Sequence, residues 1–188
     1  MSDPDLLARL DRLESRFAIA ELVTDYAVAC DEHDMDKLMG LFTEDAAFAS
    51  PSGAMVANGR AAIESMFIEL FKVRGPAFHW THDHTLRFDG SSADRANGIV
   101  LAHAETCPSG VASLAAMRYH DDYRRDAGRW RIARREIRFL YYVPFSEYAT
   151  ALTSRNRLTM RGERLPADYP ETLPAWQAFD AAHRVSGR

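Results

Sequence analysis

The sequence has few cysteines and no long apolar run. Cys30 and Cys107 are its only cysteines, lie far apart and form no CxxC pair, so we expect two small buried thiols rather than a disulfide or metal site. An uninterrupted apolar stretch of about 18 residues, which a transmembrane helix needs, does not occur. The acidic start, residues 1–5, lacks the basic and apolar regions of a signal peptide. These absences predict a cytoplasmic protein with no membrane partner.

Strong positive charge is also missing. The formal net charge is −4, and acids interrupt the arginine pairs Arg124–Arg125 and Arg134–Arg135, so we expect no nucleic-acid partner. The GxSxG elbow of serine hydrolases and the glycine-rich phosphate loops do not occur, and no cysteine stands beside a plausible histidine. The sequence therefore predicts neither nucleophilic catalysis nor a cofactor. With 47% hydrophobic and 27% charged residues, its composition is that of an ordinary globular protein.

The first third of the chain has helical periodicity. Apolar residues recur at three- and four-residue spacing from Leu6 to Cys30, and we expect a break in this long run near Ser15. Asp34 is placed to cap a short helix that ends near Phe42. Two short strands, 46–49 and 55–57, and an amphipathic helix over 63–71 complete this part.

After Gly75 the period changes to two. Four long strands, predicted at 78–88, 93–107, 111–126 and 129–143, are separated by short turns and therefore pair antiparallel. Helices followed by such a meander predict an α+β fold, a cone-shaped barrel in which a curved sheet wraps the N-terminal helices around a deep pocket. We expect this domain to span 1–143. The proline-interrupted extension, 144–188, is expected to leave the sheet and to cover the pocket or a neighbouring subunit, with a final helical turn or two around 176–182.

Asp31 and His79 are the first candidates for catalysis. Ile19, Val23, Ala27 and Asp31 are spaced four apart and so climb one helix face, which would bury a carboxylate at the end of an apolar stripe. His79 lies near the start of the first long strand. A carboxylate held against an imidazole is a minimal device for moving a proton. The ordinary alternatives are a solvated acid that caps the next helix and a histidine with a structural hydrogen bond.

The histidines of this strand also raise the question of a metal. In a regular strand His82 and His84 share one face while His79 points to the other, and no second cluster completes a ligand set, although His103 could join from the next strand. We therefore expect no metal. Two further residues are candidates. Tyr26, five residues before Asp31, either borders the same cavity or is an ordinary core tyrosine. Arg138 faces away from Ile137 and Phe139, so it lies either in solvent or in a polar pocket.

Four local motifs together resemble the SnoaL-like branch of the nuclear-transport-factor-2-like superfamily. They are the segment 18–22 followed by Tyr26 and Asp31, the helix-to-strand passage 36–46, His79 with Asp83 four residues later, and the hairpin 123–132. Within that branch the chain is similar to bile-acid 7α-dehydratase, scytalone dehydratase and hexachlorocyclohexane dehydrochlorinase. The resemblance covers about residues 5–143. The chain differs from the usual pattern of the family at Asp83, where relatives often carry Asn.

The resemblance implies cofactor-free elimination, a dehydratase-like lyase or isomerase reaction on a small hydrophobic, oxygenated substrate. It implies His79 as the base, Asp31 as its partner, and Tyr26 and Arg138 as the residues that complete the site. We also expect Asp83, His103 and Trp80 to line the pocket. The alternatives are a non-catalytic binding protein for hydrophobic small molecules and an assembly subunit resembling the small subunit of ring-hydroxylating oxygenases.

The last two long strands carry apolar residues on both faces. A sheet that is apolar on both sides usually packs against another sheet. The sequence therefore predicts a homo-oligomer, a dimer or trimer, joined through that surface.

Overall fold

The computed structural model describes residues 3–160 and 162–184 and has the expected α+β order. Its elements run α1 (Asp3–Glu32), α2 (Met35–Gly40), β1 (Phe42–Ala49), β2 (Ala57–Asn58), α3 (Arg60–Val73), β3 (Phe78–Phe88), β4 (Arg95–Thr106), β5 (Ser113–Asp126), β6 (Arg129–Pro144), the 3₁₀ helix η1 (Phe145–Thr153), β7 (Leu158–Met160), β8 (Glu163–Leu165) and α4 (Pro174–His183). As expected, the Asp34 side chain caps α2, accepting a hydrogen bond from the Lys37 backbone at 2.9 Å.

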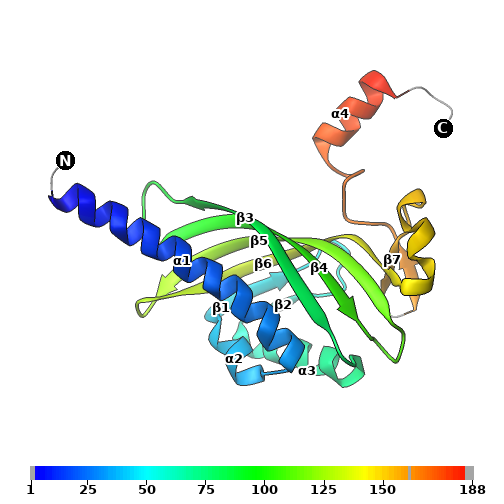
Figure 1. The fold of residues 1–188 in the computed structure, drawn as a ribbon, viewed down its shortest axis with the longest axis horizontal. Helices are drawn as coiled ribbons and strands as arrows, with labels where there is room; N and C mark the ends of the chain where they lie inside the picture. Colours follow the sequence, from blue (N-terminus) through cyan, green and yellow to red (C-terminus); the bar gives the residue numbers. More distant parts are fainter. Residues whose placement is uncertain (1–2, 161, 185–188) are drawn as a thin grey trace.

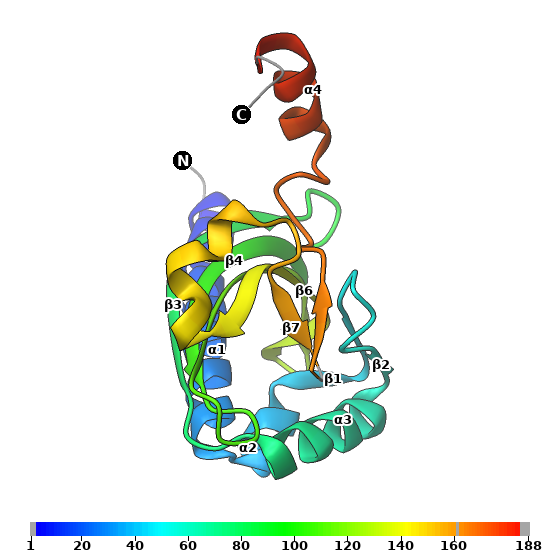
Figure 2. The same cartoon turned by 90° about the vertical axis from the view of Figure 1, so that its right-hand side faces the viewer.

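The four long strands form an antiparallel meander within one curved sheet. The strand order is β2-β1-β6-β5-β4-β3, and β1 pairs parallel with β6, which makes the sheet mixed. The sheet bends around α1, while α2 and α3 lie at its open side (Figures 1 and 2). The prediction of a curved mixed sheet over N-terminal helices is confirmed.

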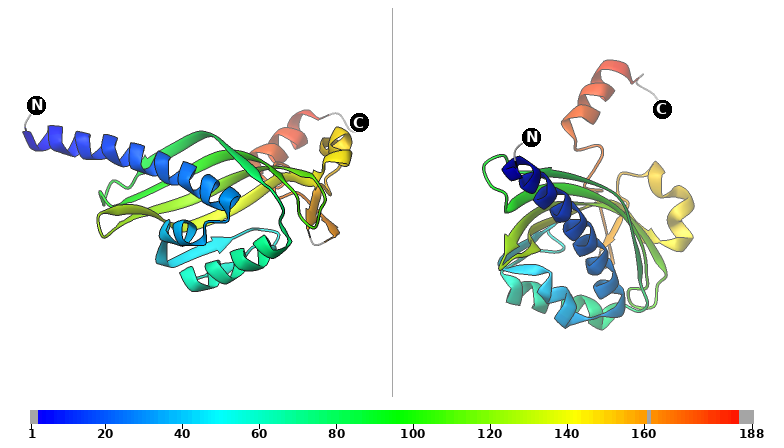
Figure 3. Two further views of the ribbon diagram at one scale, coloured as in Figure 1. Left: turned by 60° about the horizontal axis from the view of Figure 1, so that its bottom comes forward. Right: turned by 60° about the vertical axis from the view of Figure 1, so that its left-hand side comes forward.

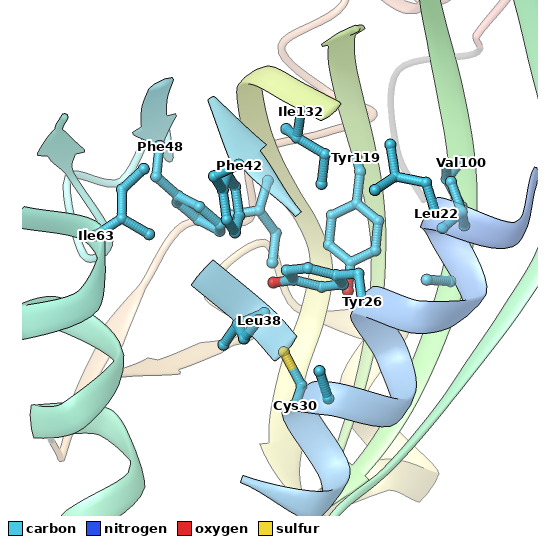
Figure 4. Packing of buried hydrophobic residues seen from close by; sticks show 14 of the residues in the cluster. Leu22, Tyr26, Cys30, Leu38, Phe42, Phe48, Ile63, Val100, Tyr119 and Ile132 are labelled. Carbon is cyan, nitrogen blue, oxygen red and sulfur yellow. The ribbon is translucent and has the colours of Figure 1, made fainter. Parts of the chain in front are cut away.

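Aromatic rings from the helices and the sheet meet in the core. Tyr26 of α1 lies edge-on to Tyr119 of β5, with ring centroids 5.8 Å apart, and also to Phe42 and Phe67 (Figure 4). The inner face of β4 carries Val100 and the small residues Ala96, Gly98, Ala102 and Ala104, while α1 packs mainly against β3 and β6.

The expected break in α1 near Ser15 does not occur, and the helix is continuous from Asp3 to Glu32. Ser15 is buried and accepts a hydrogen bond from Arg125 at 2.8 Å, so it docks the helix on the sheet. The helix still contacts the sheet before Ser15, through Asp11 with Arg125 and Arg12 over Phe88. Its first turns project beyond the sheet in Figures 1 and 3.

The C-terminal extension does join the sheet, contrary to expectation. β7 pairs parallel with β6 at Tyr142, and β8 pairs with β7. Buried Arg157 donates to the carbonyls of Leu140, Ser154 and Tyr169 and to the Glu171 carboxylate. Asp168 accepts from the Phe139 backbone at 2.8 Å. These bonds hold an extended segment beside β6, and the prolines lie outside β7 and β8.

Part of the outer sheet face is covered by the chain itself. Ala151 of η1 packs with Ala116, Tyr141 and Val143, which are on the face away from α1. This cover accounts for some of the two-sided apolar character that predicted an oligomer, and the oligomeric state stays a prediction. Among the described helices, none combines the length and hydropathy needed to cross a bilayer.

A bulge in β3 decides which histidines face inward. The register between β3 and β4 shifts between Thr81 and His84, so the strand gains one residue there. His79 and His84 therefore share the inner face, whereas His82 lies on the outer face. The sequence prediction, made for a regular strand, grouped His82 with His84.

Gly98 makes this bulge possible. A Cβ atom at this position would lie 2.2 Å from the Thr85 carbonyl oxygen and 2.8 Å from Nε2 of His84. Only a residue without a side chain leaves room for the backbone and the inward His84 ring.

We expect Gly98→Ala to lower the free energy of unfolding by about 1–3 kcal/mol, because strand β3 must shift to accommodate the methyl group. Gly90→Ala is the matched control, since a Cβ there meets nothing within 4 Å. Urea denaturation of both variants checks this. Equal stability of Gly98→Ala and the wild type would contradict it.

Candidate active site

Asp31 and His79 are in direct contact. His79 Nδ1 lies 2.5 Å from Asp31 Oδ1, and the His79 backbone N–H donates to Asp31 Oδ2 at 2.9 Å. Both side chains are largely shielded, with 9% of His79 and 17% of Asp31 exposed. The Asp31 carboxylate therefore holds both the imidazole of His79 and the backbone at the start of strand β3.

The end of α1 places Asp31 toward β3. His33 adopts a left-handed conformation (φ 55°), and the Asp34 N–H donates to the Ala29 carbonyl at 3.0 Å, which terminates the helix. Asp31 thus lies in the last turn, where the helix dipole disfavours a negative charge and no basic residue occurs. This placement is unfavourable unless the carboxylate has a strong partner, and His79 is that partner.

The contact fixes the chemistry of the imidazole. An ionised carboxylate only accepts hydrogen bonds, so the proton of neutral His79 lies on Nδ1 and Nε2 keeps its lone pair. The Asp31 carboxylate would also stabilise the imidazolium that forms when Nε2 takes up a proton. The pair has the arrangement of a general base with its orienting group.

Cys30, next to Asp31, is not placed to act as a nucleophile. Burial raises the pKa of its thiol to about 11. The thiol shares a hydrogen bond with Tyr26, one turn earlier on α1. Cys30 therefore stays a neutral thiol.

A second polar group lies deeper on the same face of the sheet. Arg135 of β6 and Asp121 of β5 are fully buried and joined by two hydrogen bonds, Nε to Oδ1 at 2.9 Å and Nη2 to Oδ2 at 2.6 Å. Burial opposes the charge of Arg135, but the Asp121 carboxylate outweighs it and raises the guanidinium pKa. A buried ion pair of this kind costs desolvation, so a role beyond stability is a reasonable expectation.

Two tyrosine rings enclose the Arg135 guanidinium. Its central carbon lies 3.9 Å from the Tyr26 ring centroid and 4.2 Å from that of Tyr119. Burial, with Cys30 and Tyr119 nearby, raises the pKa of Tyr26 well above its usual value, so its hydroxyl stays protonated. Nη1 of Arg135 is buried and has no hydrogen-bond partner among the described residues. Among the described residues, Arg135 thus keeps a buried cationic N–H₂ group without a hydrogen-bond acceptor.

Tyr123 and His84 extend this group. The Tyr123 hydroxyl donates to Asp121 Oδ2 at 2.7 Å and lies 3.3 Å from Nε2 of His84. Since that hydroxyl proton is used, His84 is the donor and carries its proton on Nε2. Burial lowers the His84 pKa below its usual value.

The remaining predicted site residues lie elsewhere. Arg138 is on the outer face, where it pairs with Glu136 at 2.5 Å, so the structure does not bring it to His79. Trp80 and His103 line a hollow of about 370 Å³ on that same outer face, with the His103 and His82 rings hydrogen-bonded at 2.9 Å. Asp83 is exposed at the bulge. No group of three metal-ligating side chains occurs in residues 3–160 and 162–184.

Arg135 is the residue that sequence reasoning missed. The signal was available, because Arg135 shares period-two spacing with the buried Ile137 and Phe139, whereas Arg138 does not. The inward direction of His84 could not be read in the same way, since it depends on the bulge.

The family follows from comparison with known proteins. The SnoaL-like domain profile matches residues 11–136. The chain belongs to the SnoaL-like family. Gamma-hexachlorocyclohexane dehydrochlorinase of Sphingobium indicum is 29% identical to this SnoaL-like protein over 153 residues, which cover 74% of the chain and 90% of the relative.

Solved structures agree with this assignment. A hexachlorocyclohexane dehydrochlorinase, LinA type 2, superimposes with a TM-score of 0.67 at 25% identity, covering 73% of this chain and 93% of that one. A nuclear-transport-factor-2-like protein of Novosphingobium aromaticivorans gives 0.60 at 30% identity, covering 81% and 97%. The SnoaL-like protein is thus related to lyases, the dehydrochlorinases.

We expect Asp121→Asn to destabilise the protein by about 3–5 kcal/mol, because it leaves the buried Arg135 charge without its counterion. Asp45→Asn removes the carboxylate of an exposed pair with Arg124 and is expected to have a much smaller effect. Chemical denaturation of the two variants checks the difference, and equal losses would refute it.

The lowered pKa of His84 also predicts that the free energy of unfolding depends on pH. The pKa of His84 in the folded state is lower than in the unfolded state, so the unfolded chain binds the extra proton first as pH falls below about 6.5. The stability present above that pH is lost as pH falls through the folded-state pKa. His84→Gln should show a flatter decline in unfolding free energy between neutral and mildly acidic pH. Parallel curves would contradict this.

Proposed function

We propose that the protein is a cofactor-free lyase that catalyses β-elimination on a small hydrophobic substrate, with His79 as the general base. The contact between His79 and the shielded Asp31 carboxylate carries this proposal. The sequence and structural similarity to dehydrochlorinases supports elimination as the class of reaction.

The reaction requires one proton and one leaving group. Nε2 of His79 takes a proton from the carbon next to the one that bears the leaving group, and the C–H electron pair becomes the new C=C bond. A chlorine departs with its bonding pair as chloride. A hydroxyl would take the proton back from His79 and depart as water. Asp31 holds the imidazole and stabilises its charge during the step.

We assign to Arg135 the role that the family resemblance implied for Arg138. The unpartnered Nη1 of Arg135 is a charged donor in a water-poor interior, where it would stabilise negative charge that develops on a halide or oxygen. Tyr26, protonated and stacked on Arg135, would position that donor. The surrounding aromatic and aliphatic side chains favour an apolar substrate, either halogenated or oxygenated.

The test compares His79→Gln and Asp31→Asn with the wild type. The substrates are gamma-hexachlorocyclohexane, with chloride release as the readout, and a cyclic β-hydroxy ketone, with enone absorbance as the readout. We expect each variant to lose about 10²–10⁴-fold in kcat on any substrate that turns over. His82→Gln, on the outer face of the same strand, is the control and should retain activity.

Unchanged turnover of His79→Gln would overturn the assignment. Tight retention of these compounds by the wild type without product would also contradict the lyase, and would favour the alternative of a binding protein for hydrophobic small molecules.

A further inference from the structure

The hollow of about 370 Å³ on the outer face of the sheet is separate from the candidate active site. The strands contribute Trp80 of β3, Glu105 of β4 and Tyr141 of β6 to its lining, and the 3₁₀ helix η1 contributes Tyr148. His79 faces the opposite side of the sheet, because it alternates with Trp80 along β3. The volume of the hollow is within the range of small-molecule sites.

Three electron-rich aromatic rings line this hollow. Tyr141 and Tyr148 meet at an interplanar angle of 59° with ring centroids 5.5 Å apart, so their two faces form a corner. Burial and a hydrogen bond with Tyr148 raise the pKa of Tyr141 above its usual value, so its hydroxyl stays neutral. Trp80 is 42% exposed, and the Phe78 ring supports it with ring centroids 4.6 Å apart. The lining therefore offers aromatic faces from β3, β6 and η1 to one ligand.

The permanent charge that lines the hollow is negative. Among the described residues, those of the lining include no lysine or arginine, and Glu105 is their one carboxylate. The Glu105 side chain is exposed and forms no ion pair with any described residue. Burial and the nearby His82 lower the pKa of His103, another lining residue, so this imidazole is neutral at neutral pH. The Glu105 charge is therefore not offset within the hollow.

Two arginines on the same side of the protein have partners of their own. Arg118, on the outer face of β5, lies over the Tyr169 ring at 4.6 Å from its centroid. Arg164 of β8 forms an ion pair with Glu147 of η1. Neither arginine lines the hollow. A cation that enters the hollow would therefore supply the missing counter-charge of Glu105.

We propose that this hollow binds an organic ammonium ion, which lies against the faces of Trp80, Tyr141 and Tyr148 with Glu105 as its counter-charge. Aromatic faces carry negative partial charge and attract ammonium groups within about 6 Å of the ring centroid. A neutral ligand would gain nothing from the carboxylate, and an anion would be repelled by it. The proposal goes beyond the elimination reaction and does not depend on it, since the two sites lie on opposite faces of the sheet.

Titration of the full chain with choline tests the site. Isothermal titration calorimetry should give saturable binding with a Kd of about 1 mM or tighter. The control ligand is dimethylbutanol, in which a carbon atom replaces the nitrogen of choline, so it keeps the shape and loses the charge. It should bind at least about tenfold more weakly. In ¹H–¹⁵N NMR spectra, choline should shift the indole N–H signal of Trp80, which is assigned by its loss in Trp80→Phe.

Variants separate the carboxylate from the rings. Glu105→Gln keeps the shape of the hollow, removes its charge and should weaken choline binding about three- to tenfold. Trp80→Leu should weaken binding by a similar factor, whereas Trp80→Phe keeps an aromatic face and should lose less. Glu69→Gln, which removes an exposed carboxylate of α3, and Phe179→Leu, which removes an exposed ring of α4, are the matched controls. Both controls should bind choline like the wild type.

Four results would overturn the proposal. The first two are the absence of saturable choline binding up to about 10 mM and equal affinities for choline and dimethylbutanol. The third is choline binding that leaves the Trp80 signal unmoved or is unchanged in Glu105→Gln. The fourth is a wild type that binds no choline and forms a dimer in sedimentation velocity that Trp80→Leu disrupts, which would assign this surface to a second copy of the chain.

Discussion

The Asp31 carboxylate bonded to His79 is the constraint on which the site depends. It joins the last turn of α1 to the start of strand β3, through both a ring nitrogen and the backbone N–H of His79. The position is electrostatically poor for an acid, because it lies at the negative end of the helix dipole. The two hydrogen bonds to His79 compensate for this placement, which the helix itself disfavours.

The interior contains a second charged pair with a different character. Asp121 and Arg135 are fully buried, and two aromatic rings and the Tyr123 hydroxyl fix their positions. Nε and Nη2 of Arg135 donate to Asp121, whereas Nη1 has no partner among the described residues. One face of the sheet thus carries both His79, the proposed base, and Arg135, the proposed charged donor, and the proposed elimination needs both functions.

The order of elements could be predicted from the sequence, because helical spacing, strand alternation and turn signals are local. The pairing of Asp31 with His79 was implied only by the resemblance to the SnoaL-like family, since the residue pattern alone also allowed a solvated acid and a structural histidine. The continuous helix through Ser15, the bulge that turns His84 inward, and the strands of the C-terminal extension could not be predicted. Each depends on a tertiary contact. These contacts are the hydrogen bond from Arg125 to Ser15, the close approach of Thr85 and His84 to Gly98, and the hydrogen bond from Arg157 to the Leu140 carbonyl. Arg138 was expected in the site only because of the resemblance, although the alternation of β6 places Arg135 on the face of Ile137 and Phe139.

The most direct test of the central claim is the tautomeric state of His79, measured by ¹⁵N chemical shifts of the imidazole nitrogens at neutral pH. The account predicts a protonated Nδ1 and an unprotonated Nε2 in the wild type, with this preference lost in Asp31→Asn. A His79 ring protonated on Nε2, or one indifferent to the loss of the Asp31 charge, would contradict it.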